Sequence, residues 1–213
     1  MPTFADYLAL VGAGMHVAAT GDSDSHRKNG SVGYPRSFLT VDKDDPSAVT
    51  PDDLRAAIRA QRTSVGEGCL MELYADGARR QGVAELVGSD AQVKVKLQAP
   101  PHVTPGTIEL YVNGISRPLL ATPEGLTLDA GGELSPSVTS AATADAVVRL
   151  DHALAGLPTD EGDLAIVAVS KNGSGLRPTG GGSAFCFSGA LYVDVDGDGS
   201  WTPWLAGTQQ LVP

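Results

Sequence analysis

The pattern of apolar and polar positions changes along the chain. Residues 3–14 carry apolar side chains at helical spacing and predict a helix with Thr3 as its N-cap. The apolar positions of this helix are Phe4, Tyr7, Leu8 and Val11. The short apolar run MHVAAT at 15–20 follows, and such a run is typical of a buried strand.

A second helix is predicted to begin at Thr50, after an irregular loop at 27–49. Thr50 is a good N-cap, Pro51 takes the first helical position, and two aspartates follow in the first turn. These aspartates complement the positive end of the helix dipole. The apolar face of this helix consists of Leu54, Ala57 and Ile58.

From about residue 65 the pattern becomes that of strands. QVKVKLQ at 92–98 alternates strictly between apolar and polar residues, and similar runs follow at 107–114, 145–154 and 163–173. The pairs Asn113–Gly114 and Asn172–Gly173 are typical of hairpin turns. Strands at this spacing predict an antiparallel β-sandwich. The glycine-rich stretch 173–183 is interpreted as a mobile loop.

These patterns divide the chain into two parts and predict an α+β fold. Residues 1–72 read as helix, strand, loop and helix, whereas residues 73–213 read as the β-sandwich. One strand cannot form a sheet, so the first part is interpreted as the end of a larger domain. Hydrophobic residues make up 42% of the 213 positions, which suffices for a core, and 26 Gly and 14 Pro favour strands joined by turns.

The net charge and the hydropathy of the chain limit which partners are expected. The net charge is −10 and no basic run occurs, so a nucleic-acid partner is not expected. No apolar run reaches 18 residues, so no membrane span is expected.

Cys69 and Cys186 lie far apart without a CxxC motif, which excludes a zinc knuckle. They are either one disulfide or two buried thiols, so the compartment stays open, with an extracytoplasmic one favoured.

The stretch DSDSH at 22–26 is the first candidate metal site. Asp24 and His26 are two residues apart, so on an extended segment their side chains point the same way. A carboxylate and an imidazole that converge can hold one divalent cation. The alternative is an Asp/Ser-rich loop whose side chains accept hydrogen bonds from their own backbone.

A family resemblance favours the metal site. ATGDSDSH (19–26), GYPRSFL (33–39) and RAQRTSVGEGCL (59–70) together resemble the end of a PHP (polymerase and histidinol phosphatase) domain, closest to the carbaryl-hydrolase-like branch. The resemblance implies a fragment of a distorted seven-stranded β/α barrel in which Asp24 and His26 bind zinc, manganese or iron. Asp22 matches less well. The implied reaction is hydrolysis of a phosphoester, ester or amide by a metal-activated water.

The resemblance also implies that part of the site lies outside this chain. The early ligands of the family include an HxH motif, which does not occur here, and His16, His102 and His152 are expected to be structural. Two ligands are too few for a catalytic cation. We therefore expect the C-terminal portion of a hydrolase, inactive alone. Its partners would be the missing N-terminal barrel region of the same polypeptide and a small-molecule substrate. Exposed apolar surface on the helix at 3–14 would further predict a homo-oligomer.

Tyr34 and Arg36 in GYPRSFL are candidates for contact with the substrate. A guanidinium near a metal cluster can bind a phosphate or carboxylate through two hydrogen bonds. The alternative is an ion pair between Arg36 and one of three nearby carboxylates. These are Asp42, Asp44 and Asp45.

The stretch DVDGDGS at 194–200 is a candidate calcium loop. Three aspartates occupy positions 1, 3 and 5 of a DxDxDG pattern, a glycine occupies position 6, and the Ser200 carbonyl would be the ligand at position 7. The aspartates are Asp194, Asp196 and Asp198. Position 12 is Leu205, where an EF-hand has glutamate, so an EF-hand is excluded.

The loop has two interpretations and suggests a second function. Members of the resembled family often end in a similar VDVDGDG stretch, but a polar hairpin in which aspartates cap the turn remains an alternative. A bound calcium here would be structural rather than catalytic. The alternative function is therefore a calcium-binding β-sandwich module with a structural role or one in binding a partner or surface.

Overall fold

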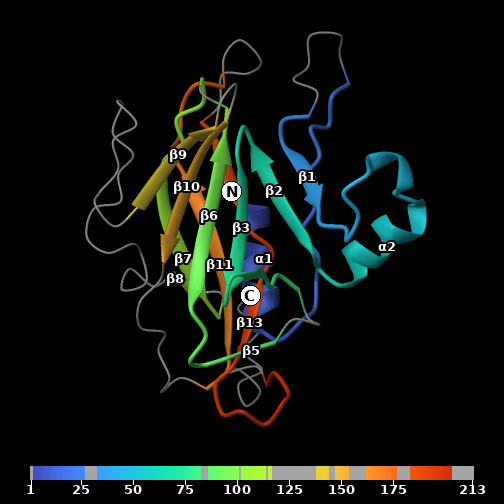
Figure 1. Cartoon of the computed structure of the whole chain (residues 1–213), viewed down its shortest axis with the longest axis vertical. Coiled ribbons are helices and arrows are strands. Elements are labelled where there is room, and N and C mark those ends of the chain that lie inside the picture. The colour runs from blue at the N-terminus through green and yellow to red at the C-terminus, as the bar shows by residue number, and fades with distance from the viewer. Residues whose placement is uncertain are drawn as a thin grey trace.

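The computed structural model of the chain shows a mixed α+β fold in which strands dominate (Figure 1). It describes residues 2–26, 33–82, 86–100, 102–113, 115–116, 138–143, 147–153, 162–176 and 183–202. Two sheets pack against each other, and buried residues from both sheets form one hydrophobic cluster. The predicted predominance of strands is confirmed.

The larger sheet contains eight strands among the described residues. They are β1 (Arg36–Leu39), β2 (Thr63–Glu67), β5 (Val87–Gly88), β7 (Thr107–Val112), β8 (Ile115–Ser116), β11 (Leu164–Lys171), β12 (Phe185–Phe187) and β13 (Leu191–Asp194). Their order is β1-β2-β12-β11-β13-β5, with β7 beside β11 and β8 beside β7. Strands β12 and β13 share one edge of β11, while β7 occupies the other edge.

Within the described ranges, the smaller sheet contains five strands in the order β4-β3-β6-β10-β9. These are β3 (Leu70–Ala75), β4 (Ala78–Arg79), β6 (Val93–Ala99), β9 (Val138–Thr143) and β10 (Val147–Ala153). Its pairs are antiparallel, as are those of the larger sheet apart from β5 with β13. In β6, Val93, Val95 and Leu97 are buried, so the face predicted from their alternation is confirmed.

The two predicted helices are present. Helix α1 (Pro2–Gly12) begins one residue earlier than expected, so Thr3 lies within the helix and is not its N-cap. Helix α2 (Pro51–Arg59) begins as predicted: Thr50 is the N-cap, and the Asp53 carboxylate accepts a hydrogen bond from the Thr50 amide at 2.7 Å. A short 3-10 helix (Pro46–Ala48) precedes it.

Strand β11 is buried on both faces. Leu164, Ile166 and Ala168 pack toward the smaller sheet within the main core. The alternate residues Ala165, Val167 and Val169 belong to a second cluster on the other face. That cluster includes Tyr7, Leu8 and Val11, so α1 covers the outer face of the larger sheet. Burial on both faces explains why this strand is a continuous apolar run.

Three local predictions were wrong. Residues 15–20 form no strand, because among the described residues no neighbouring strand pairs with them. The predicted loop 27–49 contains β1, which pairs with β2 at the edge of the larger sheet. The predicted hairpin at Asn172–Gly173 is instead a bulge: Lys171 and Asn172 lie opposite Phe185, between the pairs Ser170–Cys186 and Gly173–Ala184.

The hairpin predicted at Asn113–Gly114 is confirmed, because β7 and β8 pair with Val112 opposite Ile115. Asn113 has a φ of 51°, as a tight turn of this kind requires. The tip of the predicted mobile loop, residues 177–182, lies outside the described residues.

The first 72 residues share the body of the molecule with the rest of the chain. The division expected between residues 72 and 73 falls inside β3. Strands β1 and β2, which precede it, extend the same sheet as β11, β12 and β13. In the described structure, the loop that carries DSDSH is therefore attached directly to the sandwich.

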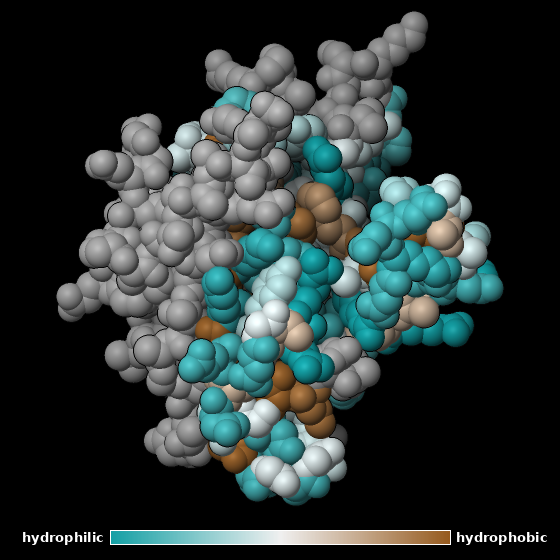
Figure 2. Space-filling model, viewed as in Figure 1, coloured by the Kyte–Doolittle hydropathy of each residue, from teal (hydrophilic) through white to brown (hydrophobic). Residues whose placement is uncertain are grey.

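The apolar face of α1 is less exposed than predicted, because it packs on the larger sheet. Among the residues whose burial is described, the exposed large hydrophobic side chains are those of Leu10, Met15, Leu54 and Ile58. Two of them lie on α2, whose predicted apolar face is therefore only partly covered. Hydrophilic residues cover most of the described surface in Figure 2, and hydrophobic residues form small separate areas. Within the described residues, no helix is both long and apolar enough to cross a membrane.

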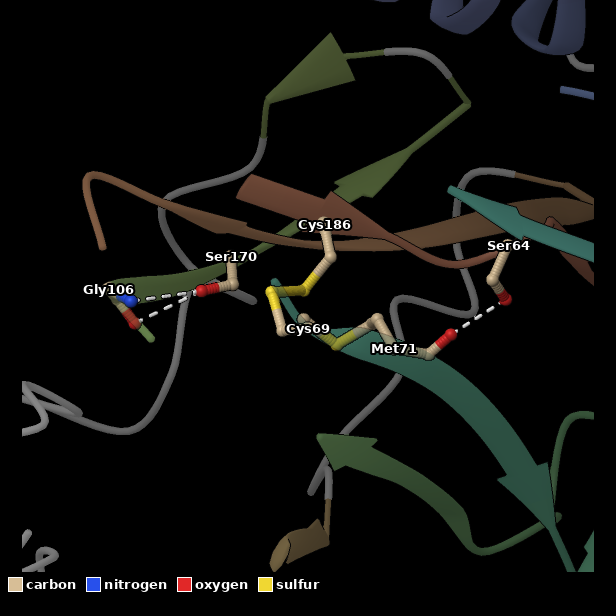
Figure 3. The surroundings of a disulfide bond; sticks show 6 residues. All are labelled: Ser64, Cys69, Met71, Gly106, Ser170 and Cys186. Atoms are coloured by element: carbon tan, nitrogen blue, oxygen red, sulfur yellow. Dashed lines mark hydrogen bonds between the residues drawn. A yellow bond between two sulfur atoms is a disulfide. The ribbon is translucent and has the colours of Figure 1, made fainter. Parts of the chain in front are cut away.

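A disulfide between Cys69 and Cys186 joins the two sheets. Cys69 precedes β3 in the smaller sheet, and Cys186 lies in β12 of the larger one; both are buried, with Cα atoms 5.7 Å apart. The sequence left this pairing open. Figure 3 shows that two serines bind backbone nearby: the Ser64 hydroxyl donates to the Met71 carbonyl at 2.7 Å, and the Ser170 hydroxyl accepts from the Gly106 amide at 3.1 Å.

Removing this disulfide is expected to lower stability substantially, because it closes a loop with a sequence separation of 117. Loop-closure entropy gives about 5 kcal/mol as an upper value. Reduction, or the double change Cys69→Ala and Cys186→Ala, should lower Tm by about 10–20 °C at that upper value. Thermal unfolding with and without reductant tests this. The double variant is the control, because reductant should not change its Tm. An unchanged Tm in the fully reduced parent would contradict the prediction.

Candidate functional site

The DSDSH loop brings Asp24 and His26 together. The Asp24 Oδ1 atom lies 2.6 Å from His26 Nε2, and both side chains are largely exposed, at 81% and 77%. The segment is not extended as expected, because Asp24 has a φ of 46°. The Asp22 carboxylate accepts a hydrogen bond from the Asp24 amide at 3.2 Å, so the alternative of an Asx-type turn is also realised.

The Ser37 hydroxyl joins this loop to the GYPRSFL segment. It accepts a hydrogen bond from the Gly21 amide at 2.8 Å and donates to the Gly21 carbonyl at 3.1 Å. Gly21 lies so close to β1 that an added Cβ would approach the Arg36 carbonyl oxygen to 3.1 Å. The first two of the three stretches that carry the family resemblance are therefore neighbours in space.

Arg36 lies over aromatic rings and forms none of the predicted ion pairs. Its guanidinium carbon is 4.8 Å from the centre of the Tyr34 ring, and its Nε donates to the Gly33 carbonyl at 2.8 Å. Asp42 instead pairs with Arg62, and Asp45 accepts from Ser47. The terminal guanidinium nitrogens thus have no carboxylate partner among the described residues. Together with Phe38 and Cys69, Tyr34 and Arg36 line a pocket of about 230 Å³.

The described residues do not complete a metal site around Asp24 and His26. Within the described ranges, the His, Cys, Asp and Glu side chains place no third ligand with this pair. His16 lies elsewhere and stacks on the Tyr192 ring, with centroids 5.7 Å apart. His102 is exposed, and the side chain of His152 lies outside what the structure describes. Two ligands do not fit the needs of a catalytic zinc, manganese or iron ion.

The acidic loop after β13, red at the bottom of Figure 1, folds around Asp194. One oxygen of this carboxylate accepts from the Gly197 amide at 2.7 Å and the other from the Gly199 amide at 2.8 Å. Gly197 and Gly199 both have positive φ, which glycine adopts without strain. The backbone therefore wraps around the first aspartate of the motif.

Asp163, which the sequence analysis did not single out, faces this loop from the start of β11. Its carboxylate accepts from the Val195 amide at 2.8 Å and from the Thr202 amide at 2.6 Å. Asn113 fixes the backbone around it: the Asn113 side chain donates to the Asp163 carbonyl and accepts from the Ala165 amide. The only sequence signal was an aspartate directly before the apolar run of β11, which does not indicate its neighbours.

The Asp163–Asp194–Asp196 cluster can hold a metal ion. One carboxylate oxygen of each residue lies within 4.8 Å of the others, and Asp163 and Asp194 are buried. Oxygen-only ligands suit a hard cation. Asp198 is not a member of this cluster, and its carboxylate accepts from the Ser200 amide at 2.7 Å; the predicted Ser200 carbonyl ligand stays a prediction. Leu205 lies outside the described residues.

The Asp194 carboxyl should give the protein a measurable acid sensitivity. Hydrogen bonds from the Gly199 and Gly197 amides to the charged form hold its pKa below the ordinary value of 3.8. The resulting stability is present above the unfolded-state pKa and is lost as pH falls through the lowered native pKa. Melting curves from neutral pH to about pH 2 should show a steeper acid limb for the parent than for Asp194→Asn. Asp44→Asn, an exposed change, is the control; identical acid limbs for parent and Asp194→Asn would refute the prediction.

The structure thus pairs Asp24 with His26 and adds Asp163 to the predicted acidic loop. It does not form the ion pair between Arg36 and Asp42, Asp44 or Asp45 that was the alternative interpretation of this residue. A comparison with models of known protein families, with curated proteins and with solved structures found no match. The function is therefore inferred from the residues that this chain brings together.

Proposed function

We propose that this chain is the C-terminal portion of a PHP-like metal-dependent hydrolase. The observation that supports this best is the Asp24–His26 pair, 2.6 Å apart on an exposed loop beside β1. Both residues match the late ligand motif of the resembled family, and the adjoining Tyr34–Arg36 segment matches its second motif. Where a metal site is shared between two parts of a polypeptide, each part carries only some of the ligands. An exposed pair such as Asp24 and His26 agrees with that arrangement.

The segment before the pair supports the same proposal. Residues 17–19 are apolar and lead through the exposed Thr20 into the loop, and Ala19 is buried. Yet the backbone of Ala18, Ala19 and Thr20 makes no hydrogen bond with any described residue. Backbone groups near a core normally find partners. A neighbouring strand from the N-terminal barrel region would supply them, and residues 15–20, which form no strand in this structure, would then pair with it.

In the complete protein, the reaction would be hydrolysis of a phosphoester, ester or amide, with zinc, manganese or iron supplying an activated water. The residues of this chain would have two tasks. Asp24 and His26 contribute ligands, and Arg36, whose terminal guanidinium nitrogens have no carboxylate partner among the described residues, can bind an anionic group of the substrate. The disulfide is of the kind that persists in oxidising compartments, which favours an extracytoplasmic location.

The hydrolase proposal is tested with a longer polypeptide. The coding sequence upstream of Met1 should encode a β/α region with an HxH motif. A protein that includes this region should bind zinc or manganese stoichiometrically and hydrolyse a p-nitrophenyl phosphoester or ester. Because each removes a ligand, Asp24→Asn and His26→Ala should lower kcat by more than about 100-fold. His102→Ala, which changes an exposed histidine elsewhere, should leave kcat unchanged.

Two results would count against the hydrolase. One is an upstream sequence without such a region. The other is stoichiometric, tight binding of zinc or manganese to Asp24 and His26 of the present chain alone, since that would show a complete site.

A second candidate function is that of a calcium-binding β-sandwich module, and the position of Asp163 favours it. Asp163 supplies a buried carboxylate that an EF-hand-like loop lacking an acid at position 12 would otherwise miss. Calcium takes six to eight oxygens, so carboxylates, loop carbonyls and waters would complete the shell. Calcium would then fix the end of β13 to the start of β11. The two functions are compatible, because the module could serve the hydrolase.

Calcium should raise the Tm of this chain. At a calcium concentration a hundredfold above Kd, mass action contributes about 2.7 kcal/mol, or about 5–10 °C. The increase should disappear in Asp163→Asn and Asp196→Asn, whereas Asp198→Asn, outside the cluster, should retain it. The measured quantity is the calcium-induced change within each variant, so any intrinsic loss of stability cancels. A parent protein whose Tm is insensitive to millimolar calcium would rule the site out.

A further inference from the structure

A groove of about 600 Å³ runs between α1 and the outer face of the larger sheet. Helix α1 forms one wall, residues 17–22 form a second, and β2 and β12 form the floor. Its volume lies within the range of small-molecule sites, about 300–1,000 Å³. It is distinct from the acidic loop, whose three clustered aspartates do not line it.

Aromatic rings make up much of this groove. Phe4 of α1 meets Phe185 edge to face, with centroids 5.5 Å apart, and lies 4.7 Å from Phe187. Tyr7 lies 5.5 Å from Phe187. Rings in such mutual contact form a rigid apolar surface whose faces carry partial negative charge. Both properties favour binding of an organic cation, because its body can pack on the rings and its charge is attracted to their faces.

The charged groups of the groove all have one sign. Three carboxylic residues line it, namely Asp6, Asp22 and Glu67, and none of the described residues that line it is basic. The chain as a whole carries a net charge of −10, which adds to the attraction for cations. An anionic ligand would therefore be repelled, whereas a cationic one would be attracted.

Glu67 is the unusual member of this set. The other two described glutamates are paired: Glu72 lies 2.7 Å from Arg79, and Glu109 lies 2.7 Å from Lys171. Glu67 is also partly buried, yet it has no hydrogen-bond or ion-pair partner within the described part of the chain. Burial raises the pKa of its carboxyl, as expected for a desolvated charge without a partner. A partly buried carboxylate of this kind is suited to pair with a cationic group of a ligand.

We propose that this groove binds a small organic cation with an apolar or aromatic body. The ammonium group pairs with Glu67, and the body lies against Phe4, Tyr7 and the two phenylalanines of β12. Carboxylate pairing and cation–π attraction act on the same ligand, so the site selects amines over neutral or acidic molecules of equal size. The proposal does not require the hydrolase or calcium functions, although one wall of the groove, residues 17–22, is the segment that the hydrolase proposal also uses.

The test compares three matched probes by isothermal titration calorimetry. These are 2-phenylethylamine, its neutral analogue 2-phenylethanol, and the acid 3-phenylpropanoate. The amine should bind at least about tenfold more tightly than the alcohol, and the acid should bind most weakly. Glu67→Gln should weaken the amine by about tenfold or more and leave the alcohol unchanged. Asp44→Asn, which removes an exposed carboxylate outside the groove, should change neither probe.

A third variant separates binding from folding. Glu67→Asp keeps the charge, so it should retain the preference for amine over alcohol even if its Tm changes. The proposal is overturned if the amine fails to bind at millimolar concentration. It is equally overturned if amine and alcohol bind alike, or if Glu67→Gln retains the preference for the amine.

Discussion

Strand β11 carries apolar side chains on both faces, so each face needs another layer to cover it. Leu164, Ile166 and Ala168 meet the smaller sheet, and the alternate residues meet α1. At about 25 cal/mol per Å² of apolar surface, neither face could stay in water without a large loss of stability. The three-layer order of helix, larger sheet and smaller sheet follows from this strand. The aromatic groove exists because the helix that covers the outer face leaves a gap beside β2 and β12.

The two ends of β11 have different roles. At its start, Asn113 fixes the backbone of Asp163, whose carboxylate then binds the loop that follows β13. At its far end, the bulge at Asn172 shifts the pairing with β12 by one residue before the glycine-rich stretch begins. The acidic cluster is thus built on a rigid element, whereas Asp24 and His26 lie on a loop joined to the sheet by the Ser37 hydroxyl.

The sequence predicted well what depends on local chemistry. The capped start of α2 at Thr50 and the alternation in β6 require only neighbouring residues, and both are confirmed. Features that depend on contacts between residues distant in the chain were harder to predict from the sequence. Asp163 joins the acidic loop because β11 and β13 are adjacent, and no periodicity encodes that adjacency. The run at 15–20 has the composition of a strand but lacks a partner among the described residues, which a pattern cannot reveal. The alternating-strand pattern also gave no sign that α1 would cover the larger sheet.

The pairing of β2 with β12 has a consequence for how the chain folds. These strands are neighbours in the sheet, and the disulfide beside them spans a separation of 117 residues. During synthesis, β1 and β2 emerge long before the strand that completes their pairing. The edge of β2 that pairs with β12 therefore stays unpaired until β12 has left the ribosome. Long-range pairing of this kind slows folding and exposes strands to aggregation.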